Sequence, residues 1–167
     1  MPADAVPADD GPADDGSADD GREREAALER AVRALARRDH SAASLRAKLG
    51  RAGISEDAQT HAVDALERAG YVDDRRFAQD RVAQLAERGY GDEWIRSDLE
   101  AQGISAETAL ASLAGLEPED ERAMRVASRA GDGVRAARLL ARRGFSDETL
   151  ERFVARSVAH DGPERVG

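Results

Sequence analysis

Arginine is the residue whose frequency and spacing in this sequence most clearly point to a chemical role. Seven basic residues and one acid lie between positions 30 and 51, and again seven basic residues and one acid between positions 122 and 143. A guanidinium group binds carboxylates and phosphates through paired hydrogen bonds, and a cluster of such groups attracts anions over long range. The two clusters therefore indicate contact with an acidic polymer or filament at two separated sites.

The candidate contact residues come from these two clusters. They are Arg37, Arg38, Arg46, Lys48, Arg51, Arg135, Arg138, Arg142 and Arg143. The segment between the clusters is mixed, because residues 75–100 contain five basic and six acidic side chains. Two basic ends thus flank a nearly neutral middle.

Residues that would support catalysis or metal binding are scarce. The chain has no cysteine. Asp39, His40 and Ser41 are adjacent in sequence, which does not by itself form a triad, and Ser41 is better explained as a helix N-cap. The three histidines show no helical i, i+4 pairing that would indicate zinc. We therefore expect no catalytic residue, no metal and no cofactor, and a protein that is not an enzyme.

The elements that would position the arginines are helices. Leu28, Ala31, Val32 and Leu35 fall at i, i+3, i+4 and i+7, which places them on one helix face. Long segments after residue 21 show this spacing, and none shows strand alternation. The sequence therefore predicts an all-α fold.

Three glycines define an internal repeat of the helical part. In each repeat a leucine lies four residues before the glycine, a large apolar residue follows it directly, and a serine comes next. The matching residues are Leu49, Gly53, Ile54 and Ser55; Leu99, Gly103, Ile104 and Ser105; and Leu140, Gly144, Phe145 and Ser146. A glycine that ends a helix lets the next residue pack back on the leucine, and the serine caps the following helix.

Each repeat is thus expected to contain three helices. The predicted units are residues 22–72, 73–116 and 117–160, followed by a flexible C-terminus at 161–167. The stretch GYVDDRRFA, residues 70–78, lies at the first joint. There Gly70 is expected to stop one helix and Asp73 to cap the next.

The first 21 residues differ in composition from the rest. They contain seven aspartates and no Lys or Arg, so the net charge of −9 falls to −2 for the remainder. Because large apolar side chains are almost absent, we expect a disordered acidic tail. The tail either mimics nucleic acid or screens a basic surface, or it is a solvated extension without a role of its own. No signal peptide or membrane span is recognisable, which leads us to expect a cytoplasmic protein.

Four segments in order resemble signatures of the RecX family, regulators of the bacterial recombinase RecA. They are RDHSAASLRAKL, GYVDDRRFA, RGYGDEWIRSDLEAQGI and LLARRGFSDETL, and the resemblance runs from about Leu28 to Val158. It implies an elongated, curved stack of three-helix modules that lies in the groove of the RecA filament on DNA. It also implies a negative modulator that inhibits ATP hydrolysis and strand exchange.

The resemblance adds three residues to the candidate contacts. Arg75, Arg76 and Arg88 match basic positions of the family pattern. The family often has basic residues after its GYG, whereas Asp92, Glu93 and Trp94 follow Gly91 here, which argues against an anion contact at this turn. The implied partner is the RecA nucleoprotein filament, bound by a monomer.

Two other functions fit the same features. A three-helix unit with a short turn resembles helix-turn-helix modules that bind DNA directly. A helical-repeat adaptor for some other partner would need only the repeat. Weak binding to single- or double-stranded DNA is expected of such arginine clusters in any case. Regulation of the RecA filament and direct binding to DNA are therefore compatible.

Overall fold

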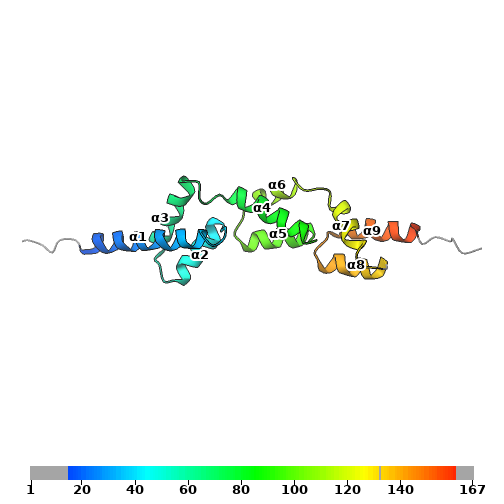
Figure 1. Cartoon of the computed structure of the whole chain (residues 1–167), viewed down its shortest axis with the longest axis horizontal. Coiled ribbons are helices and arrows are strands. Elements are labelled where there is room, and N and C mark those ends of the chain that lie inside the picture. The colour runs from blue at the N-terminus through cyan, green and yellow to red at the C-terminus, as the bar shows by residue number, and fades with distance from the viewer. Residues whose placement is uncertain (1–14, 132, 161–167) are drawn as a thin grey trace, which may run out of the picture.

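The computed structural model describes residues 15–131 and 133–160, and this part of the chain consists of nine helices and their connections without a strand. The helices are α1 (Asp15–Leu35), α2 (Ala42–Arg51), α3 (Glu56–Arg68), α4 (Asp74–Glu87), α5 (Asp92–Ala101), α6 (Ala106–Leu113), α7 (Glu119–Ala127), α8 (Gly133–Arg142) and α9 (Asp147–His160). They form an elongated row, with α1 at one end and α9 at the other (Figure 1). The predicted all-α tandem of three three-helix repeats is confirmed.

Each set of three consecutive helices packs around its own core. We call α1–α3 module 1, α4–α6 module 2 and α7–α9 module 3. Every pair of helices with extensive contact belongs to a single module, and three separate clusters of buried apolar residues match the three modules. The predicted boundaries after residues 72 and 116 fall in the connections α3–α4 and α6–α7.

The repeated glycines end the second helix of each module. Gly53, Gly103 and Gly144 have φ of 80°, 75° and 69°, a conformation that side chains with a Cβ rarely adopt. The next residue donates its backbone N–H to the leucine carbonyl five residues earlier, as in Ile104 to Leu99 at 3.0 Å. This is the Schellman arrangement, and it turns the buried Ile104 back onto the core.

The serine after each turn begins the third helix, as predicted. The hydroxyl oxygens of Ser55, Ser105 and Ser146 accept the backbone N–H three residues later. Asp73 caps α4 in the same way, accepting from the N–H groups of Arg75 and Arg76. These caps satisfy N–H groups that have no partner within a helix, so the local sequence defines where each helix starts.

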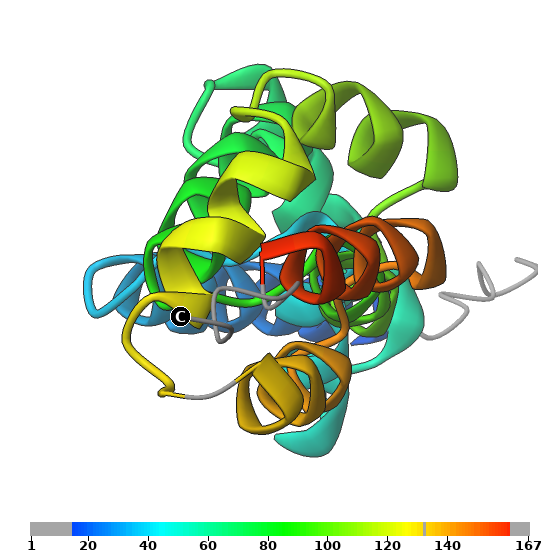
Figure 2. The same ribbon diagram turned by 90° about the vertical axis from the view of Figure 1, so that its right-hand side faces the viewer.

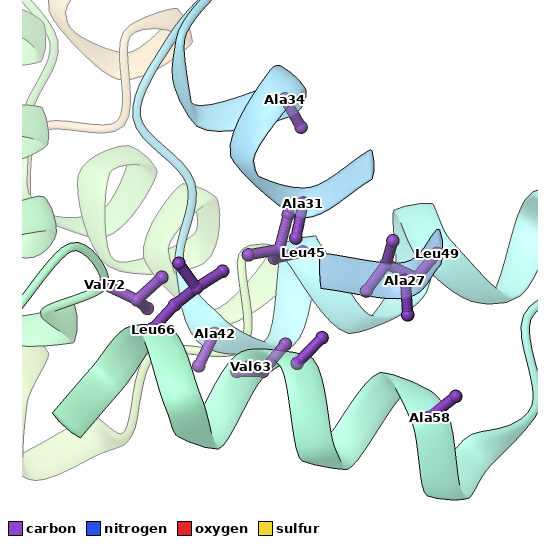
Figure 3. Packing of buried hydrophobic residues seen from close by; sticks show 11 residues of the cluster. Ala27, Ala31, Ala34, Ala42, Leu45, Leu49, Ala58, Val63, Leu66 and Val72 are labelled. Carbon is purple, nitrogen blue, oxygen red and sulfur yellow. The ribbon is translucent and has the colours of Figure 1, made fainter. Parts of the chain in front are cut away.

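The core of module 1 is narrow and rich in alanine. Ala27 and Ala31 of α1 are buried against the larger Leu45, Leu49 and Val63 of the other two helices (Figure 3). Small side chains on one helix allow close approach of its partners, which leaves little free volume in the core.

Helix α1 begins earlier than the predicted end of the acidic tail. It starts at Asp15, so residues 15–21 are helical, whereas the composition predicted disorder through residue 21. Asp19 and Asp20 lie in the first turns, where negative side chains interact favourably with the helix dipole. The rest of the predicted tail, residues 1–14, and the predicted flexible C-terminus, residues 161–167, lie outside the described residues.

The joint between modules 1 and 2 is made at the start of α2. The Ser41 hydroxyl, which is completely buried, donates to the carbonyl oxygen of Gln102 at 2.5 Å. The backbone N–H of Ala42 donates to the Asp74 carboxylate of α4 at 2.8 Å. Gly103 lies so close to α2 that a Cβ added to it would be 2.3 Å from the Cβ of Ala43. A carboxylate from the next module thus caps α2.

The joint between modules 2 and 3 repeats this arrangement at the start of α5. The N–H of Gly91 donates to the carbonyl oxygen of Arg143 at 2.8 Å, and that of Asp92 donates to the Glu119 carboxylate at 2.7 Å. Glu119 also accepts from the hydroxyl of Ser146 at 2.5 Å. Both joints therefore use a carboxylate of the following module to cap the second helix of the preceding one.

An ionic contact reinforces the second joint. The Arg122 side chain, only 4% exposed, binds the Asp92 carboxylate and donates to the carbonyl oxygens of Tyr90 and Glu117 at 3.2 and 3.1 Å. Burial raises the pKa of Asp92, although Arg122 opposes the shift. Burial acts on the pKa of Glu119 in the same direction, but hydrogen bonds from Ser146 and other groups outweigh it and lower the pKa.

We expect Gly91→Ala to disrupt the second joint. An added Cβ would lie 2.3 Å from the carbonyl oxygen of Gly144, which is backbone and cannot move aside without shifting module 3. Overpacking of this kind costs about 1–3 kcal/mol of unfolding free energy, measurable by urea denaturation. Gly21→Ala is the matched control, since nothing lies within 4 Å there and alanine favours a helix. Equal stability of the two variants would contradict this account of the joint.

Candidate partner-binding surface

Helices α1 and α2 form a basic groove on module 1. Its cations are Arg30, Arg33, Arg37 and Lys48, and its floor is made of Ala34, Leu49 and Ala52. We call this the α1–α2 groove. Arg33 pairs with Glu29 at 2.6 Å, while no ion pair of the described residues involves Arg37 or Lys48. These two predicted contact residues are therefore available to an anionic partner.

A neighbouring hollow contains Arg38 beside His40. His40 is 5% exposed, and its Nδ1 lies 3.2 Å from the Ser44 hydroxyl. Burial lowers the pKa of His40, and the charges of Arg38 and Lys48 lower it further. His40 thus serves as a polar core residue, and the hollow contains Asp39 and Asp80 as well as Arg38 and Arg81.

Helix α8 presents a second basic surface on module 3. Val134, Arg135, Arg138, Ala141 and Arg142 line one hollow, which we call the α8 face. The α8 face thus contains three of the four contact residues predicted from the second basic cluster, namely Arg135, Arg138 and Arg142. The fourth, Arg143, lies elsewhere. Because α2 and α8 belong to modules 1 and 3, the two basic surfaces lie toward opposite ends of the row (Figure 1).

A third basic hollow lies at the joint between modules 2 and 3. Its cations are Arg88, Arg122, Arg125, Arg129 and Arg143, with Glu87 and Glu117 among its acids. Three of these five cations contact other parts of the chain, because Arg122 binds Asp92, Arg125 binds Glu117 at 2.5 Å and Arg143 donates to the carbonyl oxygen of Arg88. We therefore regard this hollow as a structural joint.

Several predicted contact residues bind other parts of the chain. Arg46 of α2 pairs with Asp64 of α3 at 3.1 Å and lies 3.7 Å from Glu67. Arg76 donates to the carbonyl oxygens of Gly70 and Tyr71, at 3.4 and 3.3 Å, where α3 ends. Arg46 thus joins two helices of module 1, and Arg76 joins the start of α4 to the end of module 1, so both side chains make contacts within the chain.

Arg88 and Arg143 approach the same aromatic ring. Their guanidinium carbons lie 5.5 and 5.7 Å from the Tyr90 ring centroid, within the range of cation–π attraction. Arg143 also donates to the carbonyl oxygen of Arg88 at 2.6 Å. Trp94 stacks on Tyr90, with the ring centroids 4.1 Å apart. These four side chains, Arg88, Tyr90, Trp94 and Arg143, pack together at the joint between modules 2 and 3.

The GYG turn owes its acidic neighbours to this joint. Asp92 binds Arg122, and the N–H of Glu93 donates to the Gly144 carbonyl oxygen at 3.0 Å. The turn faces module 3, so a basic side chain at position 92 would oppose Arg122. The departure from the family pattern at Asp92 is thereby explained by a contact within the chain.

The remaining predicted contacts, Arg51 and Arg75, are exposed, and the structure brings neither into a hollow described above. Two groove residues were missing from the predicted contacts, namely Arg30 and Arg33. Their spacing with Arg37, at i, i+3 and i+7, places all three along one side of α1, and this signal was present in the sequence.

The described part of the chain contains neither a metal-binding cluster nor a helix suited to crossing a membrane. Within residues 15–131 and 133–160, no group of three or more His, Asp or Glu side chains is arranged to hold a metal ion. None of the described helices combines the length and apolar character that crossing a membrane requires.

A row of three-helix modules, each with its own core, defines a tandem helical-repeat protein. The particular family follows from sequence comparison. Residues 27–73 match the first three-helix domain of RecX, and residues 73–113 match the second. The chain belongs to the RecX family of regulatory proteins.

Relatives support this assignment over most of the chain. The regulatory protein RecX of Stenotrophomonas maltophilia (strain R551-3) is 35% identical over 138 residues, which cover 77% of this chain and 85% of the relative. The regulatory protein RecX of Xanthomonas axonopodis pv. citri (strain 306) is 37% identical over 136 residues, which cover 75% of this chain and 84% of the relative.

Solved structures share the fold. A crystal structure of RecX from Lactobacillus salivarius has a TM-score of 0.74 at 16% identity and covers 83% of this chain and 99% of its own. A crystal structure of another regulatory protein RecX has a TM-score of 0.71 at 19% identity, and the match covers 82% of this chain and 74% of that structure. At such identities the similarity concerns the fold alone.

Proposed function

We propose that this protein is a negative modulator of the RecA recombinase. It binds in the groove of the RecA nucleoprotein filament and inhibits ATP hydrolysis and strand exchange. It acts as a monomer in the cytoplasm, without catalysis of its own. Membership of the RecX family, whose members are named regulatory proteins, supports this proposal.

The observation that carries the proposal is the placement of cations at both ends of a fixed row. The α1–α2 groove offers Arg37 and Lys48 on module 1, and the α8 face offers Arg138 and Arg142 on module 3. Hydrogen bonds at both joints set how the modules carrying these groups are placed along the row. Such a surface suits a partner that repeats along an axis, as a filament does.

Direct binding to DNA is the second candidate function. The same cations would contact phosphates, and binding of that kind weakens steeply with salt, in proportion to the phosphates neutralised. Binding to a filament uses protein surfaces as well, and we expect it to tolerate more salt than binding to bare DNA.

Co-sedimentation separates the two functions. RecA filaments are assembled on single-stranded DNA with a non-hydrolysable ATP analogue, and the amount of bound protein is measured at rising salt beside the same DNA without RecA. We expect the filament to retain the protein at salt concentrations that release it from bare DNA. Identical salt curves for filament and bare DNA would favour direct DNA binding.

A further inference from the structure

The second helices of the three modules carry charges that alternate along the row. Helix α2 has three cations and no acid, and α8 likewise has three cations and no acid. Helix α5, between them, has four acids and a single cation, Arg96. In Figure 1 the three helices follow one another along the lower edge of the row, and in the view along the row α8 again lies low (Figure 2).

Two of the acids on α5 are not used by the fold. Asp92 binds Arg122, and Asp98 receives two hydrogen bonds from Arg81, at 2.7 and 2.8 Å. Glu93 and Glu100 are exposed, and neither takes part in an ion pair among the described residues. They are seven residues apart, which places them on the same side of the helix. We call this side the α5 face.

The repeat shows what the α5 face corresponds to in module 3. Gly103 and Gly144, which end α5 and α8, are 41 residues apart. By this offset Glu93 and Glu100 correspond to Val134 and Ala141, which line the α8 face together with Arg138 and Arg142. The acids of module 2 therefore occupy the helix side that carries cations in module 3.

This alternation matters for the choice of partner. A nucleic acid strand that contacted the α8 face and continued along α5 would bring its phosphates close to Glu93 and Glu100. Opposed like charges suppress binding of the wrong partner, whereas opposite charges across an interface fix its register. A protein surface, unlike a phosphate backbone, carries charges of both signs and is able to match the whole pattern.

We propose that the α5 face selects a protein surface with a basic patch beside an acidic one, and that it disfavours bare nucleic acid. This inference rests on the proposed function, because it identifies the part of the row that distinguishes a RecA filament from DNA alone. Glu93 and Glu100 are then specificity-determining residues, and their removal has opposite effects on the two kinds of partner.

The test is the double variant Glu93→Lys/Glu100→Lys of the full chain. We expect its dissociation constant for single-stranded DNA to fall about tenfold, with a steeper salt dependence. We expect the concentration that half-inhibits ATP hydrolysis by RecA filaments to rise about tenfold. Both values are measured beside wild type, and a thermal melt followed by circular dichroism establishes that the variant is folded.

The matched control is Glu25→Lys/Glu151→Lys, which makes the same change in net charge on α1 and α9. A general charge effect would tighten DNA binding equally in both variants, which would overturn the inference. Inhibition by the α5 variant at or below the wild-type concentration would also overturn it. If wild type itself fails to inhibit RecA, the proposed function fails instead, and that failure is seen without either variant.

Discussion

Replacing Arg122 with alanine is expected to lower the free energy of unfolding by about 3–5 kcal/mol, the range for removing one partner of a buried ion pair. The guanidinium group is buried at the second joint and binds Asp92 as well as two backbone carbonyl oxygens. Its removal leaves the carboxylate of Asp92, whose pKa burial already raises, without its ion-pair partner. Urea denaturation measures the loss, and hydrogen exchange should locate it in module 3 and α5.

Arg125→Ala is the control for this prediction. Arg125 lies one helical turn further along α7 and pairs with Glu117, but 56% of its side chain is exposed. Exposed pairs contribute about 0–1 kcal/mol, so we expect little change. If the Arg122 variant lost no more stability than the Arg125 variant, the joint would not depend on the buried pair.

The double variant Arg37→Glu/Lys48→Glu is expected to raise the half-inhibitory concentration for RecA ATP hydrolysis at least about tenfold. Both side chains line the α1–α2 groove without an ion pair among the described residues, so reversal of their charge repels an acidic partner and leaves the core intact. ATP hydrolysis on single-stranded DNA provides the readout, and circular dichroism confirms folding.

Arg68→Glu/Arg156→Glu is the matched control, because it makes the same change in charge at exposed positions on α3 and α9. It should inhibit at nearly the wild-type concentration. Equal loss of inhibition in both variants would show that net charge, and not the groove, determines binding. Unchanged inhibition by the groove variant would remove Arg37 and Lys48 from the interface.

The helices could be predicted because their ends depend on nearby residues. Gly53, Gly103 and Gly144 require positive φ, and a serine two residues after each glycine caps the next helix. These are local effects, visible as columns of the repeat. The extension of α1 to Asp15 was missed because composition indicates how much apolar surface a segment buries, and an exposed helical extension buries little.

The division of the arginines into structural and available ones could not be predicted. Arg46 reaches Asp64 on another helix, and Arg143 reaches a carbonyl oxygen 55 residues away. Every residue has a backbone carbonyl, so the sequence does not show which one an arginine will contact. A count of charged residues therefore could not distinguish Arg46 and Arg143 from Arg37. The corresponding carboxylate caps Asp74 and Glu119 were also hidden, because each satisfies a helix in the preceding module.

The central claim is tested most directly by ATP hydrolysis of the cognate RecA on single-stranded DNA with increasing amounts of this protein. The account predicts progressive loss of hydrolysis, and loss at amounts below one protein per RecA would indicate an effect on filament growth beyond occupation of the groove. Undiminished hydrolysis at a molar excess of folded protein would contradict the proposed modulation of RecA.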